Sequence, residues 1–243
     1  MKKKFFLSAL IVLCGFGMPA SATASSSAEA SPDMLPPLKT KIKIPLIIID
    51  PGHGGEDHGT VSRSGLTEKE VVLDMALRTE KYLKQIGFEV LMTRTTDQFI
   101  RLEDRVTFCE ERRGDLFLSI HANSAPNKQA VGFETFFHSP NMDVKGIEKY
   151  GGFLTYLSLD SKQKKSLKLA KLVQSEMEEL TLAQNRGIKM AKFHVLKYSP
   201  VPAVLVETGF LSNPTEASLL NAPDYRDKIA LALAQSIRRY CRW

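Results

Sequence analysis

Length, composition and charge set the first limits on this chain of 243 residues. With 43% apolar residues, it is long enough to bury the core of one globular domain. Its formal net charge is +6. This charge falls to about +3 without Lys2, Lys3 and Lys4 of the N-terminal segment, which is too mild to indicate a nucleic-acid-binding protein.

The N-terminal segment has the pattern of a secretory signal peptide. Three lysines precede an apolar stretch of about a dozen residues, and small residues around Ala22 offer cleavage sites. The apolar stretch is short for a membrane span, so we expect residues 1–24 to be removed and no stable membrane anchor to remain. Removal of these three lysines from 33 basic residues leaves 30, against 27 acidic ones. We therefore expect the exported protein to be in the periplasm, or to be secreted into the cell-wall space.

Residues 25–44 are rich in serine, proline and lysine and show no hydrophobic period, which predicts a flexible linker. We expect the folded domain to span residues 45–243. Two of its residues are cysteines, Cys109 and Cys241, each on the apolar side of a helical pattern. Buried free thiols are favoured there over a disulfide, although an exported protein could form one.

From residue 46 onward, short apolar runs alternate with helical patterns. In chain order we predict a strand at 46–50, a helix at 67–86, a strand at 88–94, a helix at 101–113, strands at 115–121 and 131–137, a helix at 164–183, strands at 193–196 and 203–207, and a helix at 224–241. This alternation predicts an α/β fold in a single domain, with a mostly parallel, twisted sheet and helices on both faces.

Two histidines follow predicted strands. His53 lies in the glycine-rich turn after the first strand, and His121 ends the strand at 115–121. Sheets of this kind bind ligands outside the carboxyl ends of their strands, so we expect the two histidines to be neighbours. The glycines beside His53 allow a tight turn and a close approach of the backbone to a ligand.

Two acids extend this set. Thr67 and Glu70 have the spacing of a capping box that starts a helix, which places Glu68 at the end of the loop that carries His53. The alternative role of Glu68 is an interaction with the positive end of the helix dipole. Glu207 ends an apolar strand, where a carboxylate needs a partner, either an arginine or a metal.

Two histidines, one carboxylate and an open position form a common catalytic zinc site. His53, Glu68 and His121 fit the ligands, and Glu207 fits the base that takes a proton from the attacking water. Spacing alone leaves this hypothesis open, because the sequence contains no compact metal motif such as H-E-x-x-H.

Seven stretches of the chain resemble, in order, the signatures of the zinc-dependent N-acetylmuramoyl-L-alanine amidases. They are IIIDPGHGGEDHG, LTEKEVVLDMA, FEVLMTRTTDQFIRLEDR, DLFLSIHANS, GFETFF, NRGIKMAKFHVL and PAVLVETGFLSNPTEASLL. The resemblance covers the chain from residue 45 to the C-terminus. It implies that His53, Glu68 and His121 bind Zn²⁺ and that Glu207 is the catalytic acid and base.

The reaction that the resemblance implies is hydrolysis of the amide between the lactyl group of N-acetylmuramic acid and L-alanine in peptidoglycan, for cell-wall remodelling and daughter-cell separation. Two alternatives stay open: a zinc peptidase acting on another bond of the stem peptide, and a non-catalytic wall-binding or activator module. The expected partners are peptidoglycan and a protein activator. We expect the protein to be a monomer and not to bind nucleic acid.

Several further residues receive weaker assignments. His58 stands where this family commonly has proline, and we expect it on the rim of the site rather than at the metal. His138 and His194 are expected to be structural. Asn123 and Glu134 are candidates for substrate contact, and the alternative for Glu134 is an ordinary solvent-facing strand residue.

The segment 139–165 is a polar loop around a short amphipathic stretch. Some division-linked members of the family carry an inhibitory helix at this place, and Glu148 is the candidate here for its metal-covering acid. The alternative is a plain surface helix that lines the substrate groove.

Overall fold

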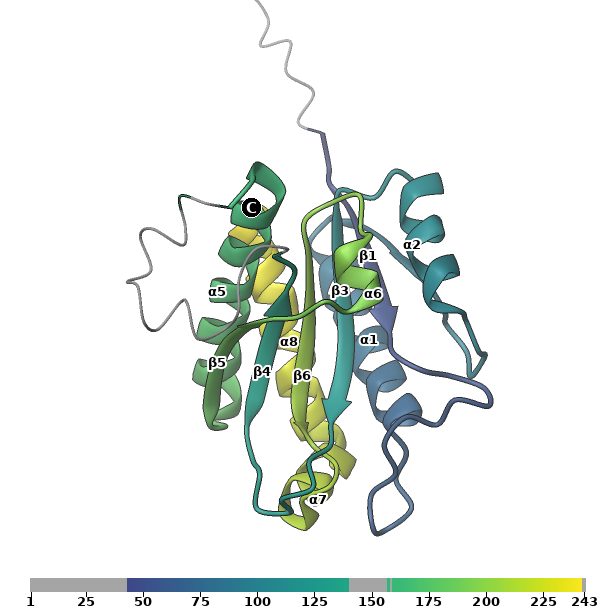
Figure 1. The fold of residues 1–243 in the computed structure, drawn as a ribbon, viewed down its shortest axis with the longest axis vertical. Helices are drawn as coiled ribbons and strands as arrows, with labels where there is room; N and C mark the ends of the chain where they lie inside the picture. The colour runs from purple at the N-terminus through teal and green to yellow at the C-terminus, as the bar shows by residue number, and fades with distance from the viewer. Residues whose placement is uncertain (1–42, 140–156, 158, 242–243) are drawn as a thin grey trace, which may run out of the picture. The chain divides into compact units, whose positions relative to one another are not determined.

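The computed structural model describes residues 43–139, 157 and 159–241 (Figure 1). Its strands are β1 Leu46–Pro51, β2 Glu89–Met92, β3 Leu116–Asn123, β4 Phe133–Phe137, β5 Asn185–Met190 and β6 Ala203–Phe210. Its helices are α1 Glu68–Gln85, α2 Leu102–Glu111, α5 Ser161–Thr181, α6 His194–Lys197, α7 Pro214–Asn221 and α8 Pro223–Cys241. None of these helices has the length and apolarity needed to cross a membrane. The predicted leader, and all of the predicted linker except residues 43 and 44, lie outside the described residues.

The six strands form one sheet in the order β2-β1-β3-β6-β4-β5. β1 runs parallel to β2 and β3, β3 to β6, and β4 to β5, whereas β4 is antiparallel to β6. The predicted α/β fold with a mostly parallel sheet is therefore confirmed. Figure 1 shows the arrows of β3 and β6 pointing the same way, so their carboxyl ends lie at the same end of the sheet.

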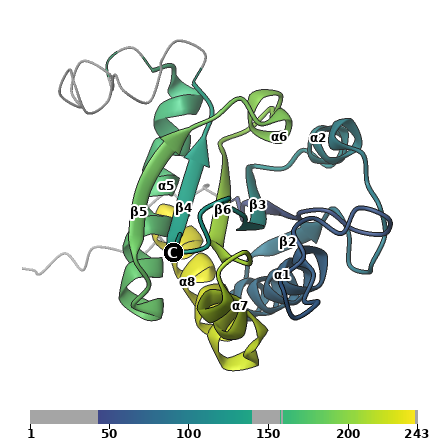
Figure 2. The ribbon, with the colours of Figure 1, turned by 60° about the horizontal axis from the view of Figure 1, so that its bottom comes forward.

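Helices cover both faces of the sheet, as predicted (Figures 1 and 2). α1, α5 and α8 pack on one face around the main core, where Ile47 and Val204 are fully buried. α2 and α6 cover part of the other face, where Ile48 and Phe117 pack against Cys109. Alternate residues of a strand point to opposite faces. Because both faces are covered, the central strands are continuously apolar rather than alternating.

Three short elements differ from the sequence prediction. The prediction of a strand at 193–196 is wrong, because His194–Lys197 forms the single-turn helix α6. The neighbouring residues Val195 and Leu196 of this helix are both buried. A short apolar run does not distinguish a strand from a buried helix. The strand of this region is β5, and its sequence NRGIKM is mostly polar because it forms an edge of the sheet. The pattern also did not predict α7, which Asn213 caps.

Cys109 is a buried free thiol, as predicted, whereas Cys241 is a free thiol that is only half-buried. Burial raises the pKa of Cys109 to about 12 and that of Cys241 to about 11. Both groups are therefore protonated at neutral pH, and a protonated thiol is a poor nucleophile.

Candidate metal centre

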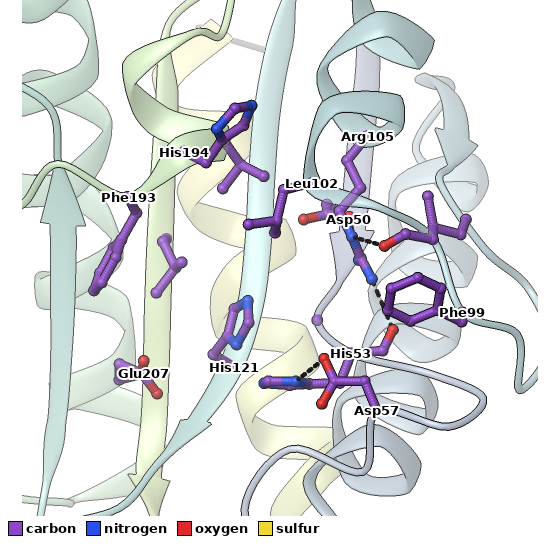
Figure 3. A pocket seen from close by; sticks show the side chains of 14 residues that line it. Asp50, His53, Asp57, Phe99, Leu102, Arg105, His121, Phe193, His194 and Glu207 are labelled. Atoms are coloured by element: carbon purple, nitrogen blue, oxygen red, sulfur yellow. Dashed lines mark hydrogen bonds and ion pairs between the residues drawn. The ribbon is translucent and has the colours of Figure 1, made fainter.

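Three of the predicted site residues lie at neighbouring positions across the sheet (Figure 3). His121 of β3 and Glu207 of β6 are partners in the parallel register. The turn after β1 is fixed beside β3, because the Gly52 N–H donates to the Ile120 carbonyl at 3.0 Å. His53 follows in this turn. The sequence pattern predicts that Glu207 ends its strand. β6 instead continues to Phe210, so Glu207 lies within the strand.

The turn that carries His53 has an unusual backbone. The φ of His53 is 58°, and the following Gly54 and Gly55 have φ values of 126° and 60°. A non-glycine residue in a sparsely populated region costs on the order of 1 kcal/mol and persists only where its surroundings enforce it. Here Arg105 donates a hydrogen bond to the His53 carbonyl at 2.8 Å. Such strain is common where a side chain must be presented to a ligand.

Glu68 reaches both histidines from the first turn of α1. The backbone N–H and the hydroxyl of Thr67 donate to the Glu70 carboxylate, and this capping pattern makes Glu68 the first helical residue. Its Oε1 lies 3.1 Å from Nε2 of His53 and 3.0 Å from Nδ1 of His121. Its other oxygen accepts a backbone N–H of the preceding loop at 2.9 Å. The carboxylate is thus held from two sides.

His53, Glu68 and His121 each offer one ligand atom, and these three atoms lie within 4.8 Å of one another. Burial alone would lower the pKa of His53, but hydrogen bonds and charge from Glu68 and Asp57 raise it to about 9. Burial alone would raise the pKa of Glu68, but hydrogen bonds from both histidines hold it well below its ordinary range. Without a metal, a proton on His53 thus supplies positive charge at the place where a cation fits. Two imidazoles and a carboxylate are a ligand set that suits Zn²⁺.

Asp57 is a residue of this site that the sequence analysis missed. Its Oδ2 accepts from Nδ1 of His53 at 2.8 Å, which turns Nε2 toward Glu68. A carboxylate on the second nitrogen fixes the tautomer and orientation of a metal-binding histidine. Its place in the same glycine-rich turn, four residues after His53, is the signal that could have identified it.

His58 is exposed, and its ring lies 3.1 Å from the Glu56 carbonyl. It is not part of the group of three ligand residues.

Glu207 has a buried carboxylate oxygen, Oε2, without a hydrogen-bond partner in the part of the chain that the structure describes. Burial is the main reason that the pKa of Glu207 rises to about 7. The charges of Glu68 and Glu134 act in the same direction, and His121 opposes them. An unsatisfied buried polar atom costs about 1–3 kcal/mol and in a native protein requires an explanation. A water molecule or a substrate group in the adjacent cavity would supply the missing partner.

The site opens into a cavity of about 480 Å³ (Figure 3). His53, His121 and Glu207 lie at one end of it, and Phe99 and Phe193 line opposite walls. These two rings are 47% and 39% exposed. A pocket with apolar walls and a few convergent polar groups is typical of a binding site for a small group or a chain segment.

The weaker candidates have different surroundings. The side-chain oxygen of Asn123 accepts the Ser124 N–H at 2.8 Å, which is a local turn contact. Glu134 is 4% exposed and forms ion pairs with Arg186 and Lys189, so the alternative of a solvent-facing strand residue is wrong. Glu148 lies outside the described residues, as does most of the segment 139–165.

The two remaining histidines make structural contacts. The ring of His138 lies 3.2 Å from the Ala191 carbonyl. His194 lies 3.9 Å from the Glu103 carboxylate, and its ring centroid is 4.6 Å from that of Tyr198. His194 also lines the cavity. Neither histidine is part of the ligand group.

Two buried arginines hold the turn of His53 from behind. Arg105 pairs with Asp50 at 2.8 Å and donates to the carbonyls of Pro51 and His53. Arg94 donates to the Pro51 carbonyl and to the next carbonyl of the same turn. Arg105 is 3% exposed and Arg94 is 1% exposed. Sequence reasoning missed both, because an arginine in a polar stretch is normally at the surface.

Substitution of Gly52 by alanine is expected to displace His121 and weaken metal binding. A Cβ at this position would lie 2.2 Å from Cε1 of His121, a separation that real contacts do not show, so the ring must move. We expect the dissociation constant for Zn²⁺ to rise roughly tenfold or more, measured by competition with a chromophoric chelator. Gly65→Ala is the control, since a Cβ added at Gly65 has no atom within 4 Å. Gly65, unlike Gly52, has a positive φ, so this control strains only its own backbone and does not displace His121. Wild-type affinity in Gly52→Ala would contradict this geometry.

Known proteins resemble this chain in both sequence and fold. Residues 47–239 match the sequence family described as N-acetylmuramoyl-L-alanine amidase. The N-acetylmuramoyl-L-alanine amidase AmiC of Neisseria meningitidis serogroup B is 37% identical over 218 residues, covering 81% of this chain and 52% of AmiC. The chain therefore spans about half the length of this relative.

Solved structures show the same architecture. The catalytic domain of the amidase CwlV from Bacillus (Paenibacillus) polymyxa var. colistinus superposes with a TM-score of 0.69 at 32% identity, covering 81% of this chain and 97% of that domain. The CwlD amidase of Clostridioides difficile, solved in complex with the GerS lipoprotein, superposes with a TM-score of 0.68 at 27% identity, covering 81% and 98%. The six-stranded domain is therefore the fold of amidase catalytic domains.

Proposed function

The chain belongs to the N-acetylmuramoyl-L-alanine amidase family, and from this premise we propose that it hydrolyses the amide between the lactyl group of N-acetylmuramic acid and L-alanine in peptidoglycan stem peptides. One observation carries the proposal. The ligand atoms of His53, Glu68 and His121 lie within 4.8 Å of one another, and the unpaired oxygen of Glu207 belongs to the neighbouring strand position. Hydrolysis of an amide needs water activation and proton transfer, and this group of residues fits both tasks.

We propose Zn²⁺ as the metal that His53, Glu68 and His121 hold. Three protein ligands of this kind leave one position of a tetrahedral zinc open, as catalytic zinc sites do. When bound, the ion would lower the pKa of water to about 7 and polarise the scissile carbonyl. Asp57 supports this assignment, because its bond to Nδ1 of His53 leaves Nε2 on the side of the ligand group.

Glu207 moves the proton in this proposal. A pKa of about 7 suits a general base that works near neutral pH, because the carboxylate takes a proton readily and the resulting acid returns it readily. The proton passes from the attacking water to Glu207, and then from Glu207 to the nitrogen of L-alanine as the amide breaks. Oε2 of Glu207 has no hydrogen-bond partner among the described residues, and this role provides one.

Zinc binding to the metal-free protein is expected to release about one proton at neutral pH. The pKa of His53 in the metal-free protein is about 9, so its imidazole must lose a proton before it can bind a metal. Zinc affinity should therefore rise by up to tenfold for each pH unit up to about pH 9 and then level off. Calorimetry in buffers with different protonation enthalpies counts the protons. His58→Ala should release the same number as wild type, and a wild type that releases none would contradict the role of His53.

We also propose that the protein is exported and acts in cell-wall remodelling and daughter-cell separation. The leader pattern at 1–24, the linker pattern at 25–44 and the catalytic domain from 45 to 243 support action in the periplasm or the cell-wall space. Control by a protein activator is part of the proposal, and the complex of CwlD with GerS supports it.

If Glu148 inhibits the enzyme, Glu148→Ala should raise turnover of the purified protein. Unchanged turnover in this variant would exclude an inhibitory role for Glu148.

The masses of the products test the proposed reaction. The purified protein is incubated with peptidoglycan alone, with a chelator, and with Zn²⁺ restored after the chelator. We expect free stem peptides that begin with L-alanine, lost with the chelator and regained with zinc. Shortened stem peptides with an intact lactyl–alanine bond would identify a peptidase instead. A folded, zinc-loaded protein that yields no product would contradict the activity of the isolated chain.

A further inference from the structure

A charged cluster lies on β4 and β5 beside Glu207. Nζ of Lys189 is 2.7 Å from Oε1 of Glu134, and Nε of Arg186 donates to the same oxygen. We call Arg186 and Lys189 the β5 cation pair. Their side chains are 31% exposed, whereas that of Glu134 is 5% exposed. The carboxylate of the cluster is therefore buried, and its two cations reach the surface.

The β5 cation pair lies on the same face of the sheet as the candidate metal centre. Glu134 is directly opposite Glu207 in the antiparallel pairing of β4 with β6, and Glu207 is the partner of His121. Partner residues on neighbouring strands share a face of the sheet. Glu134, Glu207 and His121 therefore form one row. The β4–β5 register shifts at Glu134, and Lys189 is the partner of Phe136, two positions along β4. Both cations nevertheless contact Glu134, so the pair adjoins this row on the edge strand, which Figure 2 shows beside β4.

The cluster holds more positive charge than Glu134 requires, because two cations share one carboxylate oxygen. The guanidinium of Arg186 also lies 3.3 Å from the Val131 carbonyl and 5.0 Å from the Phe210 ring centroid. These contacts fix its position, yet a guanidinium carries five N–H donors, more than the contacts described here engage. A fixed arginine beside a lysine is well suited to bind a carboxylate.

The two sides of the scissile amide differ in charge. On the glycan side, the lactyl carboxyl is consumed in the amide, whereas the stem peptide carries carboxylates from its second residue onward. Neighbouring strands are about 4.8 Å apart, so β5, two strands from β6, is roughly 10 Å from Glu207. An extended peptide advances about 3.3 Å per residue. Its second or third residue therefore reaches the β5 cation pair.

We propose that Arg186 and Lys189 bind a carboxylate of the stem peptide and thereby direct the leaving peptide across β4 and β5. This inference rests on the proposed function and adds the orientation of the substrate and a preference for acidic stem peptides. Glu134 is a positioning residue here, because its buried carboxylate holds both cations in place.

Kinetics on matched muropeptides test this inference. One pair of substrates differs only in a carboxylate or an amide on the second residue, and another pair differs in the same way on the third. For one of the two pairs, we expect a wild-type kcat/KM about 10- to 100-fold higher on the acid form, mainly through KM. In Arg186→Gln and Lys189→Gln, the ratio of kcat/KM on the acid form to kcat/KM on the amide form should fall toward one. Lys192→Gln, at an exposed lysine, is the control and should keep the preference.

The outcomes separate this inference from the proposed function. A wild type that cleaves acid and amide forms equally in both pairs overturns the role of the β5 cation pair and leaves the amidase reaction intact. Variants that lose activity by the same factor on acid and amide forms, and so keep the wild-type ratio, would show a structural role and overturn the inference too. If the wild type releases no peptide beginning with L-alanine from any form, the proposed function itself fails. Circular dichroism of each variant checks its fold.

Discussion

Replacement of Glu207 by glutamine is expected to lower kcat for stem-peptide release by about 10²- to 10⁴-fold while the protein keeps its zinc. Glutamine has nearly the shape of the carboxylate but cannot accept the proton of the attacking water. Glu207 is outside the group of three residues whose ligand atoms cluster, so metal binding should be unaffected. Product formation by mass spectrometry and zinc content by atomic absorption are measured on the same sample.

The matched control for this substitution is Glu179→Gln, at an exposed position of α5. It removes the same charge far from the cavity and should keep wild-type kcat. Near-wild-type kcat in Glu207→Gln would instead show that another group transfers the proton.

The pH dependence of kcat in the wild type provides a second test of the role of Glu207. A general base works only when it is deprotonated, so activity should fall as the pH drops through the pKa of Glu207. That pKa is about 7 in the metal-free protein, and a neighbouring cation stabilises the carboxylate. The acid limb of kcat for the zinc-loaded enzyme should therefore lie below pH 7. The residual activity of Glu207→Gln should lack this limb, and an unchanged limb would exclude Glu207 as its source.

Replacement of Arg105 by methionine is expected to lower the free energy of unfolding by about 3–5 kcal/mol. The side chains of Arg105 and Asp50 are only 3% and 1% exposed, so the substitution leaves a buried carboxylate without its counter-ion. The His53 carbonyl also loses its donor, and zinc affinity should fall together with stability. Urea denaturation followed by circular dichroism measures the first effect, and chelator competition measures the second.

Arg101→Met is the control for this experiment. Arg101 precedes α2 and forms an exposed ion pair with Asp104, so its removal should leave stability nearly unchanged. Burial opposes ionisation of Asp50, but the charge of Arg105 and three hydrogen bonds hold its pKa below 3.8. The pair therefore stabilises the fold above this pH, and its contribution is lost as the pH falls further. Equal stability of Arg105→Met and Arg101→Met at neutral pH would contradict the role of the buried pair.

Some parts of the fold and site follow directly from the sequence. The capping box at Thr67 and Glu70 predicts the start of α1, and with it the position of Glu68. His53 and His121 follow apolar runs that read as buried parallel strands, and the carboxyl ends of such strands meet at one end of a sheet. These are local patterns with a general geometric consequence.

Other parts depend on tertiary contacts that no local pattern contains. Arg94 and Arg105 stand in polar stretches, and only the folded turn shows which carbonyls they satisfy. Glu134 alternates like a surface residue of its strand, yet the unpredicted strand β5 covers it with two cations. That strand carries a polar sequence because it is an edge. Its short, mostly polar run lacks the apolar pattern that identifies the central strands.

The most direct test of the metal centre measures zinc content and amidase activity together in wild type, His121→Ala and Glu207→Gln. We predict about one equivalent of zinc and release of L-alanine-terminated peptides in wild type, neither zinc nor activity in His121→Ala, and zinc without activity in Glu207→Gln. A His121→Ala protein that keeps both zinc and activity, or a wild type that stays active after complete removal of its metal, would contradict the assignment of His53, Glu68, His121 and Glu207.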